Sequence, residues 1–348
     1  MESIHQILDV IHLSSQKDIL ATIIDVQGSA YRKEGTSMLF KEEGTRVGLL
    51  SAGCIEDDLA ERVKDLFNDG LSQTIVFDMR AEDDFSWGQG AGCNGVLRVL
   101  LEPIGHRLRS HLHTLETYLE AGKSVVIMKK LTHDYSVTDY IFLTEDHQLF
   151  GEWQGSIPAR IKCLLDSRSP IVKSGIIYME ELSAPVYLHH YQPKPRLIIF
   201  GAGQDAIPLV QFASKAGFSV LVSDWRPALC NKDNFPSATE CIVDFPVAAI
   251  KQIHFRPDDH VIVLTHNFKR DQELLQLLAN EKLGYLGVLG SRARTLRLLS
   301  NGEDLGNIRT PVGLPIGAEG PEEIAISIVA DLIRVKRLQK NSKMDAMR

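Results

Sequence analysis

Two cysteines that could bind a soft metal or carry sulfur occur in the same tripeptide, Ala-Gly-Cys. The tripeptide occupies residues 52–54 and again residues 91–93, and more glycines lie near each copy. Glycine lets the backbone come close to a ligand, because it has no side chain and adopts strained backbone angles. The thiolate form of cysteine is both a nucleophile and a metal ligand. Two such thiols predict a binding site, and inert cysteines buried beside tight turns are the alternative.

These cysteines, Cys54 and Cys93, differ in their electrostatic surroundings. Cys54 comes directly before an apolar stripe that predicts a helix from residue 55 to residue 66. A helix N-terminus stabilises a thiolate. The three acidic residues 56–58 act in the opposite direction, because nearby negative charge disfavours the thiolate. We therefore expect Cys93 to be the more reactive thiol.

A second candidate site is the nucleotide-binding pattern Gly-x-Gly-x-x-Ala, which here contains Gly201, Gly203, Gln204 and Ala206. It follows an apolar strand predicted at residues 196–200, and a helix and a second strand at 218–223 lead on to Asp224. In such a fold the first glycine makes the turn and the second lets the backbone approach a phosphate, while the acidic residue binds a ribose. A fold that has lost its ligand is the alternative.

Polar residues also follow the later strands predicted in this region, at 261–264 and 285–289. His266 comes after the first of them, and Ser291 and Arg292 come after the second. The carboxyl ends of parallel strands face the ligand crevice, so these side chains are expected near the glycine loop. Ser291 and Arg292 at a helix start predict an anion site. Solvation of a helix face is the alternative role for the arginine.

The elements that must position these residues predict an α/β fold with three parts. An N-terminal α/β domain with a mixed sheet is expected at residues 1–103, and a strand-rich connecting segment at 104–192. A Rossmann-like domain with a doubly wound parallel sheet is expected at 193–340, after the proline-containing linker 191–195. Apolar runs predict strands of the middle segment near residues 125–128, 140–143, 175–178 and 186–188.

Composition excludes several classes of protein. A formal net charge of −7 argues against a nucleic-acid partner or an anionic membrane surface, because both favour a basic face. No run approaches the roughly 18 apolar residues of a membrane helix. The first residues lack the pattern of a secretion signal, so a cytoplasmic location is expected. Five cysteines, an odd number, predict no disulfide framework in that reducing compartment.

We assign no catalytic residue and no metal ligand from the sequence. The chain has no Cys-x-x-Cys pair, and no histidine lies near Cys54 or Cys93 in sequence. His111 and His113 are two positions apart on a predicted helix, so they cannot share a face and are expected to be solvated. The adjacent pair at 189–190 is expected at the surface.

Several motifs together resemble the xanthine dehydrogenase accessory protein family, XdhC/CoxI. They follow the family's order at both ends of the chain: residues 48–56, the glycine-rich loop at Cys93, the loop at Gly201, Thr265-His266 with Asp271, residues 287–292, residues 315–317 and residues 321–325. Cys54 and Cys93 match the family's two glycine-loop cysteines. The departures are Gln204, where the family usually has histidine, and Ala52 and Asn94, where glycine is common.

This resemblance implies a chaperone rather than an enzyme. Such a protein binds the mature molybdenum cofactor, molybdopterin or its dinucleotide form, and supports its sulfuration by a cysteine desulfurase. It then inserts the cofactor into an apo-enzyme of the xanthine dehydrogenase type. A homodimer is compatible with this role. The client enzyme and the form of the cofactor stay open.

We therefore expect the cofactor between the two end domains. Its phosphate or nucleotide end is predicted near Gly203 and Arg292, and its metal end near Cys54 or Cys93, because soft thiolates suit molybdenum and sulfur chemistry. Two alternatives stay open. One is an NAD(P)-dependent oxidoreductase, favoured by the glycine loop and Asp224. The other is a docking protein without a ligand.

Overall fold

The computed structural model describes residues 4–14, 16–51, 53, 55–80, 94–158, 173–299 and 305–345. The chain forms two compact units, residues 2–193 and residues 194–348. The change of unit falls inside the proline-containing segment 191–195. Among the described helices, none combines the length and the apolar character needed to cross a lipid bilayer.

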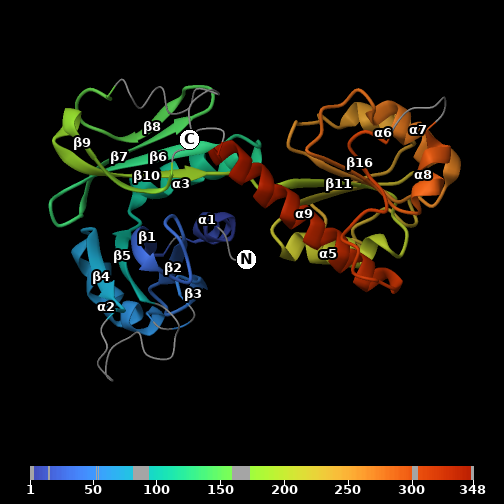
Figure 1. Cartoon of the computed structure of the whole chain (residues 1–348). Helices are drawn as coiled ribbons and strands as arrows, with labels where there is room; N and C mark the ends of the chain where they lie inside the picture. The colour runs from blue at the N-terminus through green and yellow to red at the C-terminus, as the bar shows by residue number, and fades with distance from the viewer. Residues whose placement is uncertain are drawn as a thin grey trace. The chain divides into compact units, whose positions relative to one another are not determined.

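The first unit begins with a five-stranded sheet in the order β3-β2-β1-β5-β4 (Figure 1). Its strands are β1 (Asp18–Ser29), β2 (Ser37–Lys41), β3 (Arg46–Gly48), β4 (Gln73–Asp78) and β5 (Asn94–Pro103). The α/β fold class is confirmed, but each described pairing in this sheet is antiparallel, so the sheet is not mixed as predicted. The chain returns directly from β1 to β2 and from β2 to β3, and such direct returns join antiparallel neighbours.

Helix α2 (Glu56–Asp69) covers one face of this sheet. Its apolar stripe is buried against β1 and β5 and comprises Ile55, Leu59, Val63 and Leu66. The helix predicted from this spacing is therefore confirmed. The opposite face packs on two further helices, α1 (Ile4–Leu13) and α3 (His106–Glu120).

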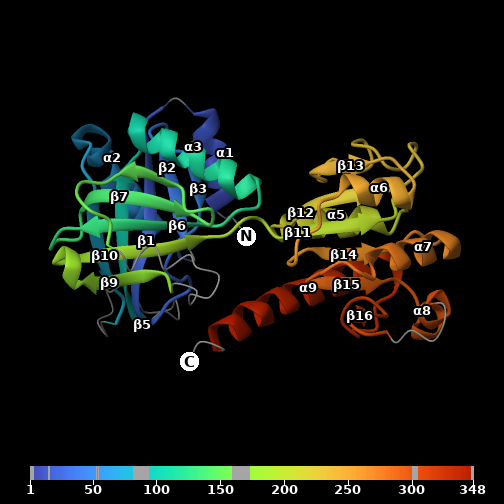
Figure 2. The same cartoon turned by 90° about the horizontal axis from the view of Figure 1, so that it is seen from above.

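A second five-stranded sheet completes the first unit, in the order β8-β7-β6-β10-β9. Its strands are β6 (Val125–Leu131), β7 (Val137–Thr144), β8 (Leu149–Glu152), β9 (Gly175–Met179) and β10 (Ala184–Tyr191), and a short 3-10 turn, η2 (Glu180–Leu182), joins the last two. The four strands predicted here are confirmed as β6, β7, β9 and β10. Helices α1 and α3 lie side by side (Figure 2). Their apolar residues contribute to one core with residues of both sheets. The domain division at residue 103 stays a prediction.

A buried ion pair joins the two sheets of this unit. Lys129 of β6 pairs with Glu102 of β5, and their side chains are only 3% and 5% exposed. Tyr187 packs nearby in a small apolar cluster with residues of β1 and β5. Burial and the charge of Glu102 raise the pKa of Tyr191 on the same strand as Tyr187. The two sheets are thus held by charge as well as by apolar packing.

Three of the histidines predicted to be at the surface, His111, His189 and His190, are half-buried instead. The Nδ1 atom of His111 lies 3.0 Å from the hydroxyl of Tyr140. The Nδ1 atom of His189 lies 2.7 Å from the hydroxyl of Ser174. A hydrogen bond offsets the loss of water around each of these two rings, which is why both are tolerated below the surface. His113 is exposed, as predicted.

The second unit contains a six-stranded parallel sheet in the order β13-β12-β11-β14-β15-β16. Its strands are β11 (Arg196–Phe200), β12 (Ser219–Ser223), β13 (Glu240–Ile242), β14 (His260–Val263), β15 (Tyr285–Val288) and β16 (Ile308–Arg309). Numbered along the unit, this is the 3-2-1-4-5-6 order of dinucleotide-binding folds. The Rossmann-like parallel sheet is confirmed.

Helices cover both faces of this sheet (Figure 1). On one face α5 (Ala206–Lys215) and α9 (Gly320–Asp345) pack against alternate residues of β11 such as Ile199. On the other face α6 (Pro246–Gln252), α7 (Phe268–Leu278) and α8 (Arg292–Leu298) pack against the intervening residues such as Ile198. Alternation of side chains along a strand explains this division, and both faces are buried.

One buried histidine lies inside the second unit. His260 at the start of β14 is 2% exposed and contacts the rings of Phe218 and Tyr285, with centroids 5.6 and 6.1 Å away. Neither ring nitrogen has a hydrogen-bond partner among the described residues. Burial lowers the pKa of His260, because the charged imidazolium loses its hydration.

This histidine predicts an acid-sensitive stability. Because the pKa of His260 is lowered in the folded state, its contribution to the free energy of unfolding is complete above the ordinary histidine pKa of 6.5. That contribution is lost as the pH falls below 6.5. Between pH 7.5 and pH 5.5 we expect the free energy of unfolding to fall by about 1 kcal/mol less in His260→Phe than in the parent, measured by urea unfolding. His133→Phe, at an exposed position, is the control. An unchanged pH profile in His260→Phe would contradict the assignment.

Candidate functional site

In folds of this kind the ligand crevice lies at the carboxyl ends of the central parallel strands. Strand β11 is followed by α5 on one face of the sheet, whereas β14 is followed by α7 on the other face. A crevice opens where neighbouring strands send their connections to opposite faces. The predicted residues that follow β11, β12, β14 and β15 all belong to this end of the sheet.

The glycine loop after β11 has the backbone that its pattern predicts. Gly201 has a φ of +123°, and a Cβ atom there would lie 2.5 Å from the carbonyl oxygen of Leu264, so another residue does not fit. Gly203 is different, because a Cβ there would meet only the ring of His266 at 3.9 Å. The backbone at Gly203 is therefore open toward the crevice. Ala206 is fully buried where α5 packs on the sheet, and Gln204 is exposed.

Asp224 is buried, and its carboxylate is fully engaged. Oδ2 accepts hydrogen bonds from the amide of Ala202 at 2.8 Å and from Nη2 of Arg226 at 2.7 Å. Oδ1 accepts from the amide and from Nε of Arg226, both at 2.9 Å. A carboxylate has about four acceptor positions, so little capacity is left for a ribose. Burial alone would raise the pKa of Asp224, but these hydrogen bonds outweigh it and lower the pKa.

Aromatic and cationic side chains beside Asp224 form a group that was not predicted from the sequence, which we call the aromatic platform: Trp225, Arg226, Phe245 and Arg270. The rings of Trp225 and Phe245 are within 10° of parallel, with centroids 6.5 Å apart. The guanidinium of Arg226 lies 4.6 Å from the Trp225 ring, and that of Arg270 lies 4.6 Å from the Phe245 ring. Phe245 is 49% exposed. A flat, negatively charged ligand could stack here. The signal in the sequence was a tryptophan directly after the strand-ending aspartate.

An imidazole lies beside the glycine loop although the loop itself carries Gln204. His266 follows β14 with a φ of +56°, and its Nε2 atom lies 2.8 Å from Oδ2 of Asp205. Asp205 belongs to the glycine loop, so this pair joins the ends of β11 and β14. The His266 side chain is 57% exposed. The histidine is therefore accessible to a ligand in the crevice.

Asp271 after β14 is buried, and it holds neighbouring side chains in place rather than binding a ligand. Asp271 is 1% exposed and accepts from the hydroxyl of Thr265 and from Nη2 of Arg294, both at 2.5 Å. Ser291 caps α8 by accepting from the amide of Arg294 at 3.2 Å. Arg292 is exposed, and no described carboxylate forms an ion pair with it. Of the residues predicted around the anion site, Arg292 is the one with a charge available to a phosphate.

Both cysteines of the repeated tripeptide, Cys54 and Cys93, lie outside the described residues. Their roles in the predicted site stay predictions. The residues on either side of position 54 are described, however. They show how the turn before α2 is built.

The turn before α2 is organised by the carboxylate of Glu56. Oε1 accepts from the amides of Leu50 at 3.1 Å and Ser51 at 2.6 Å, and Oε2 accepts from the Ser51 hydroxyl at 2.5 Å and the Ile55 amide at 3.2 Å. Gly53, with a φ of +106°, donates its amide to the Ser51 hydroxyl at 3.1 Å. Burial alone would raise the pKa of Glu56, but the hydrogen bonds from Ser51 and the backbone lower it.

Two of the three acidic residues expected to disfavour a thiolate at position 54 form ion pairs. Glu56 is turned into the loop, as described above. Asp57 pairs with Arg46 at 2.7 Å, and Asp58 pairs with Arg62 at 2.6 Å. Their negative charges are therefore partly compensated, and this weakens the electrostatic reason for preferring Cys93 over Cys54.

Three family models match the chain in sequence order. The model of the XdhC and CoxI family matches residues 13–78. The model described as BH1974-like, central domain matches residues 106–192, and the model of the XdhC Rossmann domain matches residues 197–332. The turn before α2, the second sheet and the nucleotide-binding fold each fall within one of these matches.

Known proteins are similar to this chain over most of its length. A protein of Bacillus subtilis (strain 168) that is named as a probable xanthine dehydrogenase subunit is 42% identical over 337 residues, which is 97% of this chain and 98% of that protein. The molybdenum cofactor insertion chaperone PaoD of Escherichia coli (strain K12) is 24% identical over 336 residues, 94% of this chain and 86% of that protein. A crystal structure described as a xanthine dehydrogenase from Bacillus halodurans has a TM-score of 0.85 and 48% identity, and covers 96% of each chain.

The Glu56 turn generates a stability prediction. Glu56→Gln replaces one acceptor oxygen with an amide donor that faces backbone amides, so we expect a loss of about 1.5–3 kcal/mol at pH 7. Because the folded pKa of Glu56 is lowered, its contribution is present above the ordinary value of 4.5 and is lost as the pH falls through the folded pKa. The variant should therefore differ most from the parent above pH 4.5, measured by urea unfolding.

Asp57→Asn is the matched control for this substitution, because the Asp57 side chain is 86% exposed on the same helix. Its unfolding free energy should change by less than about 1 kcal/mol. Equal stability losses in the two variants would rule out a special role for Glu56 in the turn.

Proposed function

This chain belongs to the XdhC and CoxI family, and on that premise we propose that it binds the molybdenum cofactor as cargo and delivers it to an apo-enzyme of the xanthine dehydrogenase type. Its similarity to PaoD, named as a molybdenum cofactor insertion chaperone, supports the cargo and the delivery step. The relatives named for xanthine dehydrogenase support the class of client. A cytoplasmic location follows from this role.

The observation that carries the proposal is an accessible glycine-loop backbone and the aromatic platform at the same end of one sheet. Gly203 leaves the backbone accessible just before α5, where the helix dipole favours an anion. Arg292 supplies a positive charge that no described carboxylate neutralises. Trp225 and Phe245 offer parallel rings to a flat heterocycle. The molybdenum cofactor combines a phosphate with a fused-ring pterin, so the residues present suit it.

The chemistry proposed for the metal end depends on the two cysteines. Thiolates are soft ligands that suit molybdenum, and they can also pass sulfur between proteins. We propose that Cys54 or Cys93 contacts the metal end of the cofactor while a cysteine desulfurase supplies sulfur. His266, paired with Asp205 beside the glycine loop, is placed to hold or move a proton at its exposed imidazole. A homodimer is compatible with this proposal.

An NAD(P)-dependent oxidoreductase is the alternative function. The strand order and the glycine loop favour it, since both are typical of dinucleotide-binding folds. The hydrogen bonds of Asp224 argue against an oxidoreductase, because Ala202 and Arg226 already occupy the acceptor positions that a ribose hydroxyl would need. The cofactor chaperone is therefore the better-supported function.

Variants of the crevice test this proposal. Trp225→Ala removes the stacking surface and Arg292→Ala removes the positive charge, and each should weaken retention of molybdopterin about tenfold or more. Arg297→Ala, later on the same helix as Arg292, is the control and should retain the cofactor. The measurement is mass spectrometry of the cofactor bound to the full chain after gentle desalting. Undiminished retention in both variants, or turnover of NAD or NADP by the parent chain, would contradict the proposal.

The thiol role has its own test. In the Cys54→Ser, Cys93→Ser double variant we expect less molybdenum to be retained, because serine oxygen is a poorer ligand for a soft metal centre. Molybdenum per chain is measured by inductively coupled plasma mass spectrometry, with Cys163→Ser as the control cysteine. Undiminished molybdenum in the double variant would exclude a thiolate ligand and leave the crevice proposal standing.

A further inference from the structure

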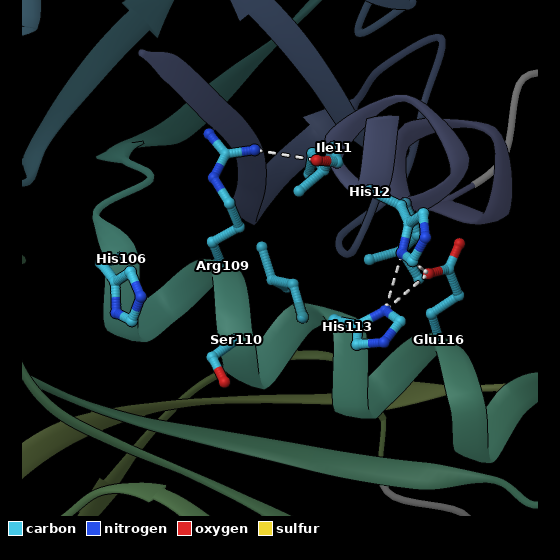
Figure 3. Close-up of a pocket in the computed structure, with 9 residues that line it drawn as sticks. Ile11, His12, His106, Arg109, Ser110, His113 and Glu116 are labelled. Atoms are coloured by element: carbon cyan, nitrogen blue, oxygen red, sulfur yellow. Dashed lines mark hydrogen bonds and ion pairs between the residues drawn. The ribbon is translucent and has the colours of Figure 1, made fainter. Parts of the chain in front are cut away.

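Three side chains of types that bind metal ions converge on the surface of the first unit. His12 lies in the last turn of α1, and His113 and Glu116 lie one turn apart on α3. The two Nδ1 atoms are 2.8 Å apart. Oε2 of Glu116 lies 3.4 Å from Nδ1 of His12 and 3.3 Å from Nδ1 of His113. Figure 3 shows the three side chains turned toward one another beside a pocket of about 310 Å³.

The separations suit a tetrahedral divalent cation. Zinc binds imidazole nitrogen and carboxylate oxygen at about 2.0–2.2 Å, so neighbouring ligand atoms of a tetrahedral site lie about 3.3–3.5 Å apart. Both separations that involve Glu116 fall in this range. The separation between the two nitrogens is shorter. It can widen by a small rotation of His12 and His113, because their side chains are 50% and 55% exposed.

The charge of Glu116 gives a second, independent argument. Its side chain is only 12% exposed, and within the described part of the chain its ion-pair partners are the two histidines. Arg109 lines the same pocket, but its guanidinium donates to the carbonyl oxygens of Ile11 and Ser14 and to Asp18, at 2.8, 2.9 and 2.8 Å. This largely buried carboxylate therefore faces no permanent positive charge among the described residues. A bound cation would supply one.

We propose that His12, His113 and Glu116 bind a divalent transition-metal cation, and that zinc fits the site best. Two imidazoles and one carboxylate are a set that zinc uses together with a fourth position for water. The exposed side of the cluster leaves that position open. The site lies within the first unit and does not depend on the proposed cargo.

The bound ion would link helix α1 to helix α3. One ligand comes from α1, which packs against β2 and β3 of the first sheet, and two come from α3, which packs against β6 and β8 of the second. Metal binding would therefore stabilise the joint between the two sheets, because an ion that binds only the folded state shifts the folding equilibrium.

Zinc chloride titrated into the full chain, after removal of metal with a chelator, tests the proposal. We expect one strongly bound ion per chain by calorimetry and a melting temperature raised by about 5–10 °C when free zinc is about a hundred times the Kd. His12→Ala and His113→Ala should each weaken zinc binding at least about tenfold, because a site with three protein ligands loses one. Cobalt in place of zinc should give the visible absorption bands of a tetrahedral site in the parent chain but not in His12→Ala or His113→Ala.

The matched control is His106→Ala. His106 is an exposed histidine on the same helix and lines the same pocket, yet it lies about two helical turns from His113 (Figure 3). Its removal should leave zinc binding unchanged. Equal zinc affinities for the parent, His12→Ala and His113→Ala would overturn the proposal, as would an equal loss in His106→Ala. A proton shared by the two imidazoles would then account for their 2.8 Å separation.

Discussion

Lys129 of β6 and Glu102 of β5 place opposite charges inside the first unit, where either charge alone would be costly. Removing a single ion from water costs several kcal/mol, so each strand needs the charge carried by the other. The pair thus requires the two sheets to be folded together, although one family model matches residues 13–78 and another matches residues 106–192. Helices α1 and α3 also connect the two sheets, because their apolar residues share one core with residues of both.

Much of the fold could be predicted because its signals are local. Strand β11 and the loop after it follow from an apolar run of four residues and two glycines, and the stripe of α2 follows from helical spacing. The direction of the strands in the first sheet could not be predicted, since it depends on which strands pair. The apolar runs themselves carry no sign of parallel or antiparallel pairing.

The candidate site was only partly visible for a similar reason. The positions of Gly201 and Gly203 follow from the pattern, but the engagement of Asp224 depends on how the side chain of Arg226 folds back. The Glu56 side chain points into the preceding turn, which the order of residues does not reveal. His12 and His113 are separated by 101 positions, so only the packing of α1 on α3 brings them together.

The saturated carboxylate of Asp224 also bears on how such crevices diverge. Two of its four hydrogen bonds come from the guanidinium of Arg226, and the other two come from backbone amides that any residue could supply. Without the side chain of Arg226, Asp224 would therefore have acceptor positions free for a ribose. During evolution, ligand preference in this architecture could change at position 226 without any alteration of the sheet, the glycine loop or the strand order. The fold would then be a poor guide to the ligand, and position 226 a more informative one.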